Sequence, residues 1–231
     1  MRISAKDLGW LAVDDFCPRC FWIERHVKGL PYQMGFPGIF SSIDAYTKNI
    51  VERYFNKNGK LPSWLKEIGE IKRIVAVKPS DFKVIKDNDI TFTGIPDLIF
   101  QRPDNSYGIV DYKTAKYTAN QDAFMPVYQI QLNGYAYIAE GTGYRPVNDL
   151  YLVYFEPPYK EAYEQITDGH TNGNGFEMPF KPTVHRIKKD TKEIDRLLEK
   201  ASKIYELGKP PKGLDACKDC ERLKGLINMV N

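Results

Sequence analysis

Three charged residues carry the clearest chemical signal in the sequence. Asp97 follows a Gly-Ile-Pro segment, and Asp111 and Lys113 flank a tyrosine in the next β-prone run. A Pro-Asp-Asn-Ser turn separates the two runs, which is typical of a hairpin. With the turn centred near Asn105, residues 97 and 111 lie roughly opposite each other, with Cβ atoms about 5 Å apart. Alternation along a strand then places Lys113 on the same face as Asp111.

This arrangement is suited to hold a divalent cation. The neighbouring runs are continuously apolar, as in buried central strands, and two opposed carboxylates would repel there by roughly 3 kcal/mol at an effective dielectric near 20. Carboxylate oxygens suit Mg²⁺ or Mn²⁺, which polarises a phosphate and lowers the pKa of a bound water. Lys113 can orient or deprotonate that water. The alternative is a solvent-facing strand with a stray ion pair.

All four cysteines of the chain fall into two CxxC pairs, one near each end. They are Cys17, Cys20, Cys217 and Cys220. Such pairs in a reducing compartment are more often metal ligands than disulfides, and they bind either one ion or an iron–sulfur cluster. A shared site would join the cysteine-bearing terminal elements, residues 1–37 and 205–231. Four unrelated buried thiols are the alternative.

The elements that position these residues follow from periodicity. A helix is expected over SSIDAYTKNIVERYF, with Ser41 or Ser42 as its cap, and Gly59 is expected to end it. Ile43, Tyr46, Ile50 and Tyr54 are expected to form its apolar face. Short β-prone runs follow, including ITFTGIPDLIF and YGIVDYKT. Because Pro96 cannot donate to a sheet ladder, we expect a bend or bulge beside Asp97.

Further elements complete a mixed α/β pattern. A second helix is expected from about Asn120 to Glu140, a strand over DLYLVYFE, a strand around Pro182 to Ile187, and a third helix over TKEIDRLLEKASKIYEL. This order of helix, antiparallel strands, helix, strand and helix predicts an α/β (α+β) domain. We expect residues 1–231 to form a single domain with its core at 38–190.

Composition adds little about function. Hydrophobic residues make up 42% and charged residues 27% of the chain, as in ordinary globular proteins, and the net charge of +3 does not by itself indicate a nucleic-acid binder. No apolar run approaches the ~20 residues of a membrane span, and the first residues lack the features of a signal peptide. A cytoplasmic protein without membrane contact is the expectation.

Taken with Gln131-Leu132-Asn133-Gly134-Tyr135, the two hairpin motifs resemble the PD-(D/E)XK nuclease superfamily. The order Gly-x-x-Asp, Asp-x-Lys, Gln-x-x-x-Tyr is similar to that of its RecB-type branch, and the likeness covers roughly residues 38–140. The resemblance implies a restriction-endonuclease-like core, with a central mixed sheet flanked by helices. It also implies that Asp97 and Asp111 bind Mg²⁺ or Mn²⁺ and that Lys113 is catalytic.

The same resemblance suggests supporting residues. It implies that the Tyr112 carbonyl is an added metal ligand and that Gln131 and Tyr135 contact DNA or position Lys113. Many relatives carry a His or Glu on the first helix as a further ligand, but no His lies between Ser41 and Gly59. Asp44 occupies the matching place, with Glu52 as second choice. The spacing of Asp44, Lys48 and Glu52 is also that of a solvated charge ladder, which is the alternative.

The cysteines fit the resemblance too. Helicase-nucleases of the AddB type and CRISPR-adaptation exonucleases bracket this core with a four-cysteine iron–sulfur cluster, usually with one Cys before it and three after. The likeness favours [4Fe-4S], whereas the two-and-two split suits tetrahedral zinc equally.

The implied activity is a metal-dependent deoxyribonuclease, exonuclease-like on single strands or free ends. Its implied partners are DNA and a separate helicase, repair or CRISPR-adaptation protein. An inactive DNA-binding or complex-assembly subunit on the same fold is one alternative. A protein whose termini are joined by a zinc ion and that has no nucleic-acid role is another alternative.

Overall fold

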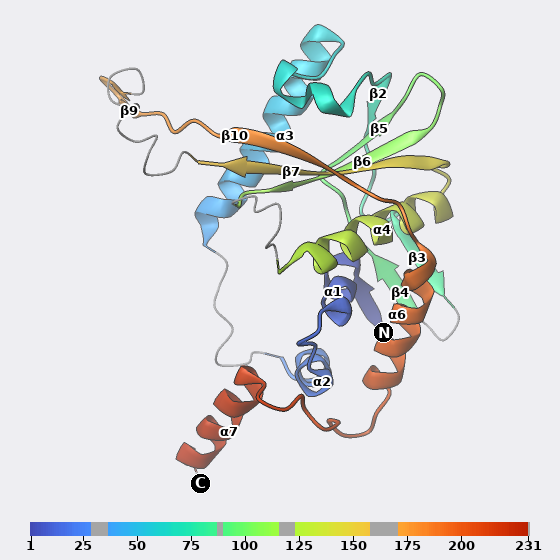
Figure 1. The fold of residues 1–231 in the computed structure, drawn as a ribbon, viewed down its shortest axis with the longest axis vertical. Coiled ribbons are helices and arrows are strands. Elements are labelled where there is room, and N and C mark those ends of the chain that lie inside the picture. Colours follow the sequence, from blue (N-terminus) through green and yellow to red (C-terminus); the bar gives the residue numbers. More distant parts are fainter. Residues whose placement is uncertain (29–36, 87–89, 116–122, 158–170, 231) are drawn as a thin grey trace.

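The computed structural model describes residues 1–28, 37–86, 90–115, 123–157 and 171–230. In this part of the chain, helices lie on both faces of a five-stranded mixed sheet (Figure 1). The predicted fold class, a mixed sheet flanked by helices as in restriction-endonuclease-like proteins, is therefore confirmed. None of the described helices combines the length and apolar character needed to cross a membrane.

The five-stranded sheet has the order β10-β7-β6-β5-β2. Its strands in chain order are β2 (Arg73–Val75), β5 (Leu98–Gln101), β6 (Tyr107–Lys113), β7 (Val147–Glu156) and β10 (Lys181–Ile187). Only the β6–β7 pair is parallel, and the other neighbours are antiparallel. β5, β6 and β7 are buried along most of their length because helices cover both faces, which explains their continuous apolar runs.

The β5–β6 hairpin has the predicted register. Leu98 pairs with Val110, and Ile99 pairs with Ile109, so position 97 faces position 111. Asn105 adopts a left-handed backbone conformation with φ of 66° in the turn, and the Asp104 carboxylate accepts hydrogen bonds from Ser106.

The run ITFTGIPDLIF does not form the single, bent strand that the sequence predicts. It divides into β4 (Ile90–Thr93) and β5, which belong to different sheets. β4 joins a second sheet of order β1-β4-β3, with β1 (Arg2–Ser4) parallel to it and β3 (Lys83–Lys86) antiparallel. The chain crosses between the sheets at the Gly-Ile-Pro segment, since proline cannot continue a ladder. Asp97 thus lies immediately before β5.

Helices pack on the two faces of the larger sheet. The described helices are α1 (Ala5–Gly9), η1 (Trp10–Ala12), α2 (Pro18–His26), α3 (Gly38–Asn58), η2 (Ser63–Ile68), α4 (Met125–Gly141), α6 (Lys192–Tyr205) and α7 (Lys218–Val230). Of these, α7 lies away from the sheet, near α2 (Figure 1). One core lies between the sheets and α1, α4 and α6, and includes Ile99 and Ile109. The other lies under α3 and η2 and includes Phe100 and Val110. A short hairpin of β8 (Thr171–Asn172) and β9 (Gly175–Phe176) completes the described strands.

The first long helix differs from expectation at its start and on its surface. α3 begins at Gly38, so Ser41 and Ser42 lie inside it, and the Ser42 hydroxyl donates to the Gly38 carbonyl rather than capping the helix. Its end is as predicted, because Gly59 adopts φ of 66° and its N–H donates to the Phe55 carbonyl.

The predicted apolar face of α3 is present, but other elements cover little of it. The residues buried from this helix are Val51 and Phe55, which pack against η2 and the sheet. Tyr46 is 68% exposed, and Ile50 and Tyr54 are exposed as well. Ile43, Tyr46 and Ile50 instead line an open apolar groove with Trp64 and other residues. Their helical spacing indicated one face of the helix but not whether other elements cover it.

The second helix begins later in the described residues than the predicted start at about Asn120. α4 begins at Met125, and residues 120–122 of the prediction lie outside the described part of the chain. α1 packs closely on α4. A Cβ atom at Gly9 would lie 2.5 Å from the Val127 carbonyl oxygen, and one at Gly134 would lie 2.9 Å from the Ala5 Cβ. Glycine at both positions allows the two helix backbones to approach.

Candidate active site

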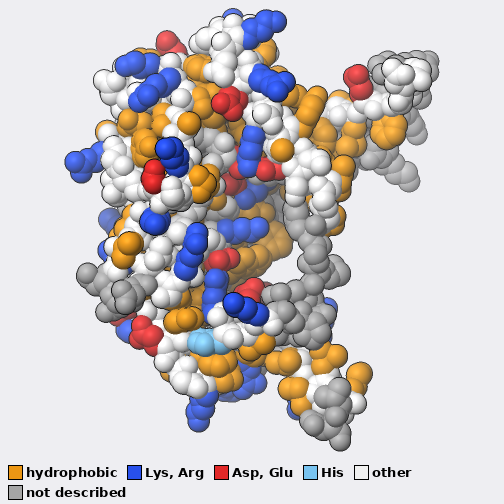
Figure 2. Space-filling model, turned by 180° about the vertical axis from the view of Figure 1, so that it is seen from behind, with side chains coloured by type: hydrophobic (Ala, Val, Ile, Leu, Met, Phe, Trp, Pro, Cys, Tyr) orange, Lys and Arg blue, Asp and Glu red, His pale blue; other side chains and the backbone are white. Residues whose placement is uncertain are grey.

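A cavity of about 520 Å³ lies where α1, α3 and α4 meet the end of β6. Its lining contains all of the predicted Mg²⁺/Mn²⁺-site and supporting residues. The full lining is Lys6, Phe40, Ser41, Asp44, Lys48, Asp97, Asp111, Tyr112, Lys113, Thr114, Gln131 and Tyr135. On the face opposite to that of Figure 1, acidic and basic side chains gather near a central hollow (Figure 2).

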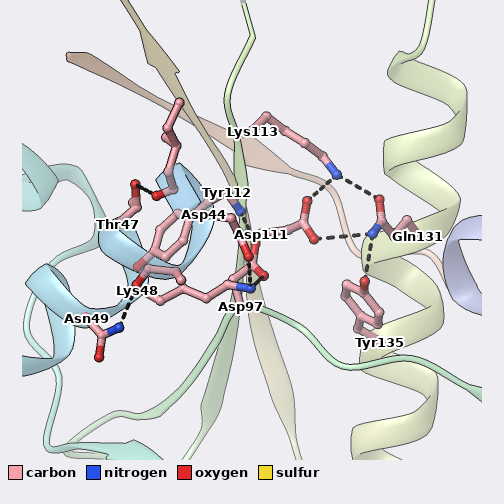
Figure 3. Close-up of polar contacts among 12 residues, drawn as sticks. Asp44, Thr47, Lys48, Asn49, Asp97, Asp111, Tyr112, Lys113, Gln131 and Tyr135 are labelled. Atoms are coloured by element: carbon pink, nitrogen blue, oxygen red, sulfur yellow. Dashed lines mark hydrogen bonds and ion pairs between the residues drawn. The ribbon is translucent and has the colours of Figure 1, made fainter. Parts of the chain in front are cut away.

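Asp97 is fixed by the strand opposite it. Its Oδ2 accepts a hydrogen bond from the backbone N–H of Tyr112 at 2.6 Å, so the carboxylate is held beside β6. The proline before it has ended the ladder, which lets the side chain turn toward the end of β6 and α3 (Figure 3). Its other oxygen, Oδ1, contacts Lys48.

Asp111 is the most buried charged group of the site, with 3% of its surface exposed. Its Oδ2 lies 2.5 Å from Lys113 Nζ, and its Oδ1 accepts a hydrogen bond from Gln131 Nε2 at 3.3 Å. Burial raises the pKa of Asp111 to about 6, with Lys113 lowering it and the negative charge of Asp97 raising it. Burial therefore makes the ionised form of Asp111 less favourable than it would be in water.

Lys113 is held from three sides. Besides the Asp111 carboxylate, its ammonium group donates to Gln131 Oε1 at 3.0 Å and lies 4.4 Å from the ring centre of Tyr128. Alternation along β6 brings it to the same face as Asp111, as the hairpin predicted.

Gln131 and Tyr135 connect this group to α4. They lie one helical turn apart, and Gln131 Nε2 donates to the Tyr135 hydroxyl at 2.7 Å as well as to Asp111 (Figure 3). Gln131 thus contacts Lys113 through its oxygen and Asp111 through its nitrogen. A Cβ at Gly94 would lie 2.6 Å from the Tyr135 ring, so the glycine of the first motif makes room for the tyrosine of the third.

Lys48 is the residue that sequence reasoning missed. Its Nζ lies 2.7 Å from both Asp44 Oδ2 and Asp97 Oδ1, and so bridges α3 to the start of β5. Burial lowers the pKa of Lys48, but hydrogen bonds to both carboxylates more than offset this and raise it. The charge-ladder interpretation placed Lys48 on a solvated face, which is wrong for this residue. Glu52 is exposed and does not line the cavity, so the geometry favours Asp44 as the first-helix carboxylate.

The types of side chain at this site are those that a hard divalent cation prefers, although among the described residues the close-lying set of metal ligands is that of the four cysteines. Asp44, Asp97 and Asp111 supply carboxylate oxygens, the ligands preferred by Mg²⁺ and Mn²⁺. The Oδ2 atom of Asp111 is buried, and the Lys113 ammonium group is its partner among the described residues. A cation bound at this oxygen would share it with Lys113 or displace the lysine.

The four cysteines gather at a second site, where the start of α2 approaches the start of α7. Their sulfur atoms all lie within 4.8 Å of one another. Cys20 Sγ lies 3.6 Å from the sulfurs of Cys217 and Cys220, and Cys17 Sγ lies 3.6 Å from that of Cys220. The predicted joining of the two terminal elements at a four-cysteine cluster is therefore confirmed.

Backbone donors support this second site. The Leu214 N–H donates to Cys17 Sγ at 3.3 Å. Burial alone would raise the pKa of Cys17, but hydrogen bonds from the Cys20 and Leu214 backbone lower it to about 7. Burial, followed by the neighbouring sulfurs, raises the pKa of Cys20, and burial is the main reason that the pKa of Cys220 is raised to about 11. All four thiols would therefore ionise together only with a cation that compensates their charge. The Arg19 side chain also donates to the Pro211 carbonyl at 3.0 Å, which ties the incoming C-terminal segment to α2.

Comparison with known proteins agrees with this geometry. The model of the PD-(D/E)XK nuclease superfamily matches residues 19–223. This range includes every predicted active-site residue and three of the four cysteines, Cys20, Cys217 and Cys220. The chain belongs to the PD-(D/E)XK nuclease superfamily. No curated protein sequence matches it significantly.

Proposed function

We propose that the protein is a Mg²⁺- or Mn²⁺-dependent deoxyribonuclease that hydrolyses phosphodiester bonds in the cavity between α3 and α4. The convergence of Asp97, Asp111 and Lys113, with Gln131 contacting two of them, is the observation that carries the proposal. Membership of a nuclease superfamily supports it. A scaffold that only bound DNA would gain nothing from a buried carboxylate whose charged form is disfavoured.

Each residue has a chemical role in this proposal. Asp97 and Asp111, together with Asp44 and the Tyr112 carbonyl, hold the cation, which when bound polarises the scissile phosphate and lowers the pKa of a water. Lys113 orients that water and stabilises the negative charge that develops on the phosphate. Gln131 fixes the position of Lys113, and Tyr135 fixes Gln131.

Lys48 changes partner in the reaction we propose. Without a cation its ammonium group neutralises Asp44 and Asp97. With a divalent cation held by those carboxylates, Lys48 would be displaced, and its long side chain would be able to reach a phosphate in the same cavity. Lys6, which is exposed on α1 and also lines the cavity, is placed to contact a neighbouring phosphate.

The finer assignment to the RecB-type branch rests on the order of the three motifs. It supports an exonuclease-like action on single strands or free ends, with a separate helicase, repair or CRISPR-adaptation protein as partner. The nuclease core in this proposal comprises residues 38–190 together with α1, because α1 packs against α4 beside the cavity.

For the four cysteines we propose a single structural zinc ion. Tetrahedral ligands at a Zn–S distance of about 2.3 Å lie roughly 3.8 Å from one another. Three of the sulfur separations are 3.6 Å, close to that figure, and all four sulfurs lie within 4.8 Å of one another. Thiolates of a four-iron cluster bind separate iron atoms and must lie farther apart. The geometry thus favours zinc over the [4Fe-4S] cluster that the resemblance suggested.

Elemental analysis and colour test the zinc assignment. The protein purified without oxygen should be colourless and contain about one zinc per chain. A brown protein that contains iron and absorbs near roughly 400 nm would instead establish the cluster.

The activity is tested with end-labelled single-stranded and duplex DNA in the presence of Mn²⁺ or Mg²⁺. We expect cleavage that a chelator stops, and a loss of about 10²- to 10⁴-fold in rate for Lys113→Ala, because the group that assists the water and the phosphate is gone. DNA binding measured in Ca²⁺ should persist.

Lys60→Ala serves as the matched control, since Lys60 is exposed and does not line the cavity. Equal cleavage by the Lys113→Ala protein would contradict the proposal. Binding without any cleavage by the wild type would favour the inactive assembly subunit.

A further inference from the structure

A row of aromatic side chains extends from the candidate active site. Trp10 in η1 and Phe124 just before α4 meet edge to face, with ring centres 5.7 Å apart. Phe124 in turn lies 6.3 Å from Tyr128, centre to centre. We call Trp10, Phe124 and Tyr128 the aromatic strip.

The strip is continuous with the site rather than separate from it. The ring of Tyr128 lies 4.4 Å from Lys113 Nζ, the group placed at the scissile phosphate. Tyr128 and Gln131 belong to the same helix, α4, and Trp10 directly follows α1, which carries Lys6 at the cavity. α1 and η1 lie against the first half of α4 (Figure 1), so the strip follows the line of contact between these elements.

The outer end of the strip faces solvent. Trp10 is 42% exposed and Phe124 is 49% exposed. Partly exposed aromatic side chains that lead to a cationic group are an arrangement by which proteins bind unpaired nucleic acid. Bases stack on the rings while lysines contact the phosphates.

We propose that the aromatic strip binds single-stranded DNA and leads it to Lys113. Successive bases stack on the exposed rings of Trp10 and Phe124, and the backbone then enters the cavity between Lys6 and Lys113. Paired bases present no free ring face at their interior, so a duplex cannot use the strip. The direction in which the DNA strand runs, toward Lys113, rests on the proposed nuclease function. The binding of single-stranded DNA to the strip does not depend on that function.

Binding is tested without cleavage, using a fluorescein-labelled oligothymidylate and the full-length protein in a chelator or in Ca²⁺. We expect Trp10→Ala and Phe124→Ala each to raise the Kd about tenfold, because one stacking contact is lost. Trp10→Phe should restore most of the affinity, since it keeps an aromatic ring. The affinity for a blunt duplex of equal length should stay unchanged in all variants.

Trp64→Ala is the matched control, because Trp64 is exposed to a similar extent, 37%, but lines a different groove. An unchanged Kd for Trp10→Ala, no binding of the oligonucleotide by the wild type, or an equal loss in Trp64→Ala would overturn the inference. Thermal melting of each variant excludes misfolding as the cause.

The two proposals fail in different ways. A wild-type protein that binds the oligonucleotide through Trp10 but does not cleave it would refute the nuclease activity and leave the strip standing. A protein that cleaves single strands equally well with and without Trp10 would refute the strip alone.

Discussion

Asp111 lowers the stability of the metal-free protein at a position that we propose to bind the cation. It is a buried carboxylate whose pKa burial raises to about 6, although Lys113 lies 2.5 Å away. In the metal-free protein, the charged form is therefore disfavoured relative to the unfolded chain, where the carboxylate is hydrated. A bound cation would reverse this balance, because it favours the ionised carboxylate.

Asp111→Asn should consequently stabilise the metal-free protein at neutral and alkaline pH. Because the folded pKa is raised above the unfolded value of 3.8, the cost of ionised Asp111 is fully present above about pH 6 and disappears below about pH 4. We expect a gain of about 1–3 kcal/mol at pH 8 that vanishes near pH 4. Urea unfolding of both proteins in a chelator measures it, and a constant difference across this pH range would contradict the account.

Gln131 allows a second test at the scale of the residue. Gln131→Leu removes the hydrogen bonds to Lys113, Asp111 and Tyr135 while keeping similar bulk. Groups that orient ligands and catalytic residues typically contribute 10- to 100-fold, so we expect the cleavage rate to fall by about that factor. The Kd for DNA should change little.

Gln129→Leu, on the exposed side of the same helix, is the control and should cleave normally. If Gln131→Leu cleaved as fast as wild type, Gln131 would have no positioning role.

At the scale of elements, the sequence predicted the hairpin well and its neighbours less well. Turn chemistry and alternation fix a β-hairpin locally, so the register of Asp97 against Asp111 followed from the sequence. Lys48 could not be placed, because its contact with Asp97 depends on where α3 crosses β5 and not on spacing within the helix. The open groove beside Tyr46 escaped prediction for the same reason, since burial of a helix face depends on its neighbours.

The packing of α1 on α4 supports both the cavity and the aromatic strip, and Gly9 makes it possible. In Gly9→Ala, the new methyl group would overlap the Val127 carbonyl oxygen at 2.5 Å and force the elements apart. We expect a loss of about 1–3 kcal/mol in unfolding free energy. Chemical denaturation of the two proteins provides the measurement.

Gly225→Ala is the control for this substitution. A methyl group there meets no atom within 4 Å, and alanine favours the helical conformation of α7. Its stability should be unchanged or slightly higher. An equal loss in both variants would show that the close contact at Gly9 is unimportant.

At the scale of the whole molecule, the cysteine site closes the chain on itself. It joins α2 to α7, and a cross-link between such distant parts of a sequence restricts the unfolded chain strongly. The sequence predicted the joining of the termini, because two CxxC pairs that contain all four cysteines are best explained as ligands of one shared metal site. It could not decide between zinc and a cluster, which depends on the separation of the sulfur atoms.

Removal of the metal should therefore loosen the C-terminal helix first. We expect Cys220→Ser, or treatment with a strong chelator, to expose residues 206–217 to trypsin while β5, β6 and α4 stay protected. Time-resolved mass spectrometry of the fragments records this order. Cleavage that is equally slow with and without the metal would show that α7 docks without it. The matched Ser80→Ala variant, at an exposed position outside the cysteine cluster and the monitored segment, should digest as wild type does.

The central claim is that Asp97 and Asp111 hold the cation of a nuclease. The position of Mn²⁺ in a crystal, located by its anomalous scattering, tests it most directly. We predict a peak at about 2.1 Å from a carboxylate oxygen of each residue. Lys48 Nζ should have moved away from both Asp44 and Asp97. Mn²⁺ bound elsewhere, with Lys48 still bridging these two carboxylates at full Mn²⁺ occupancy, would contradict the account.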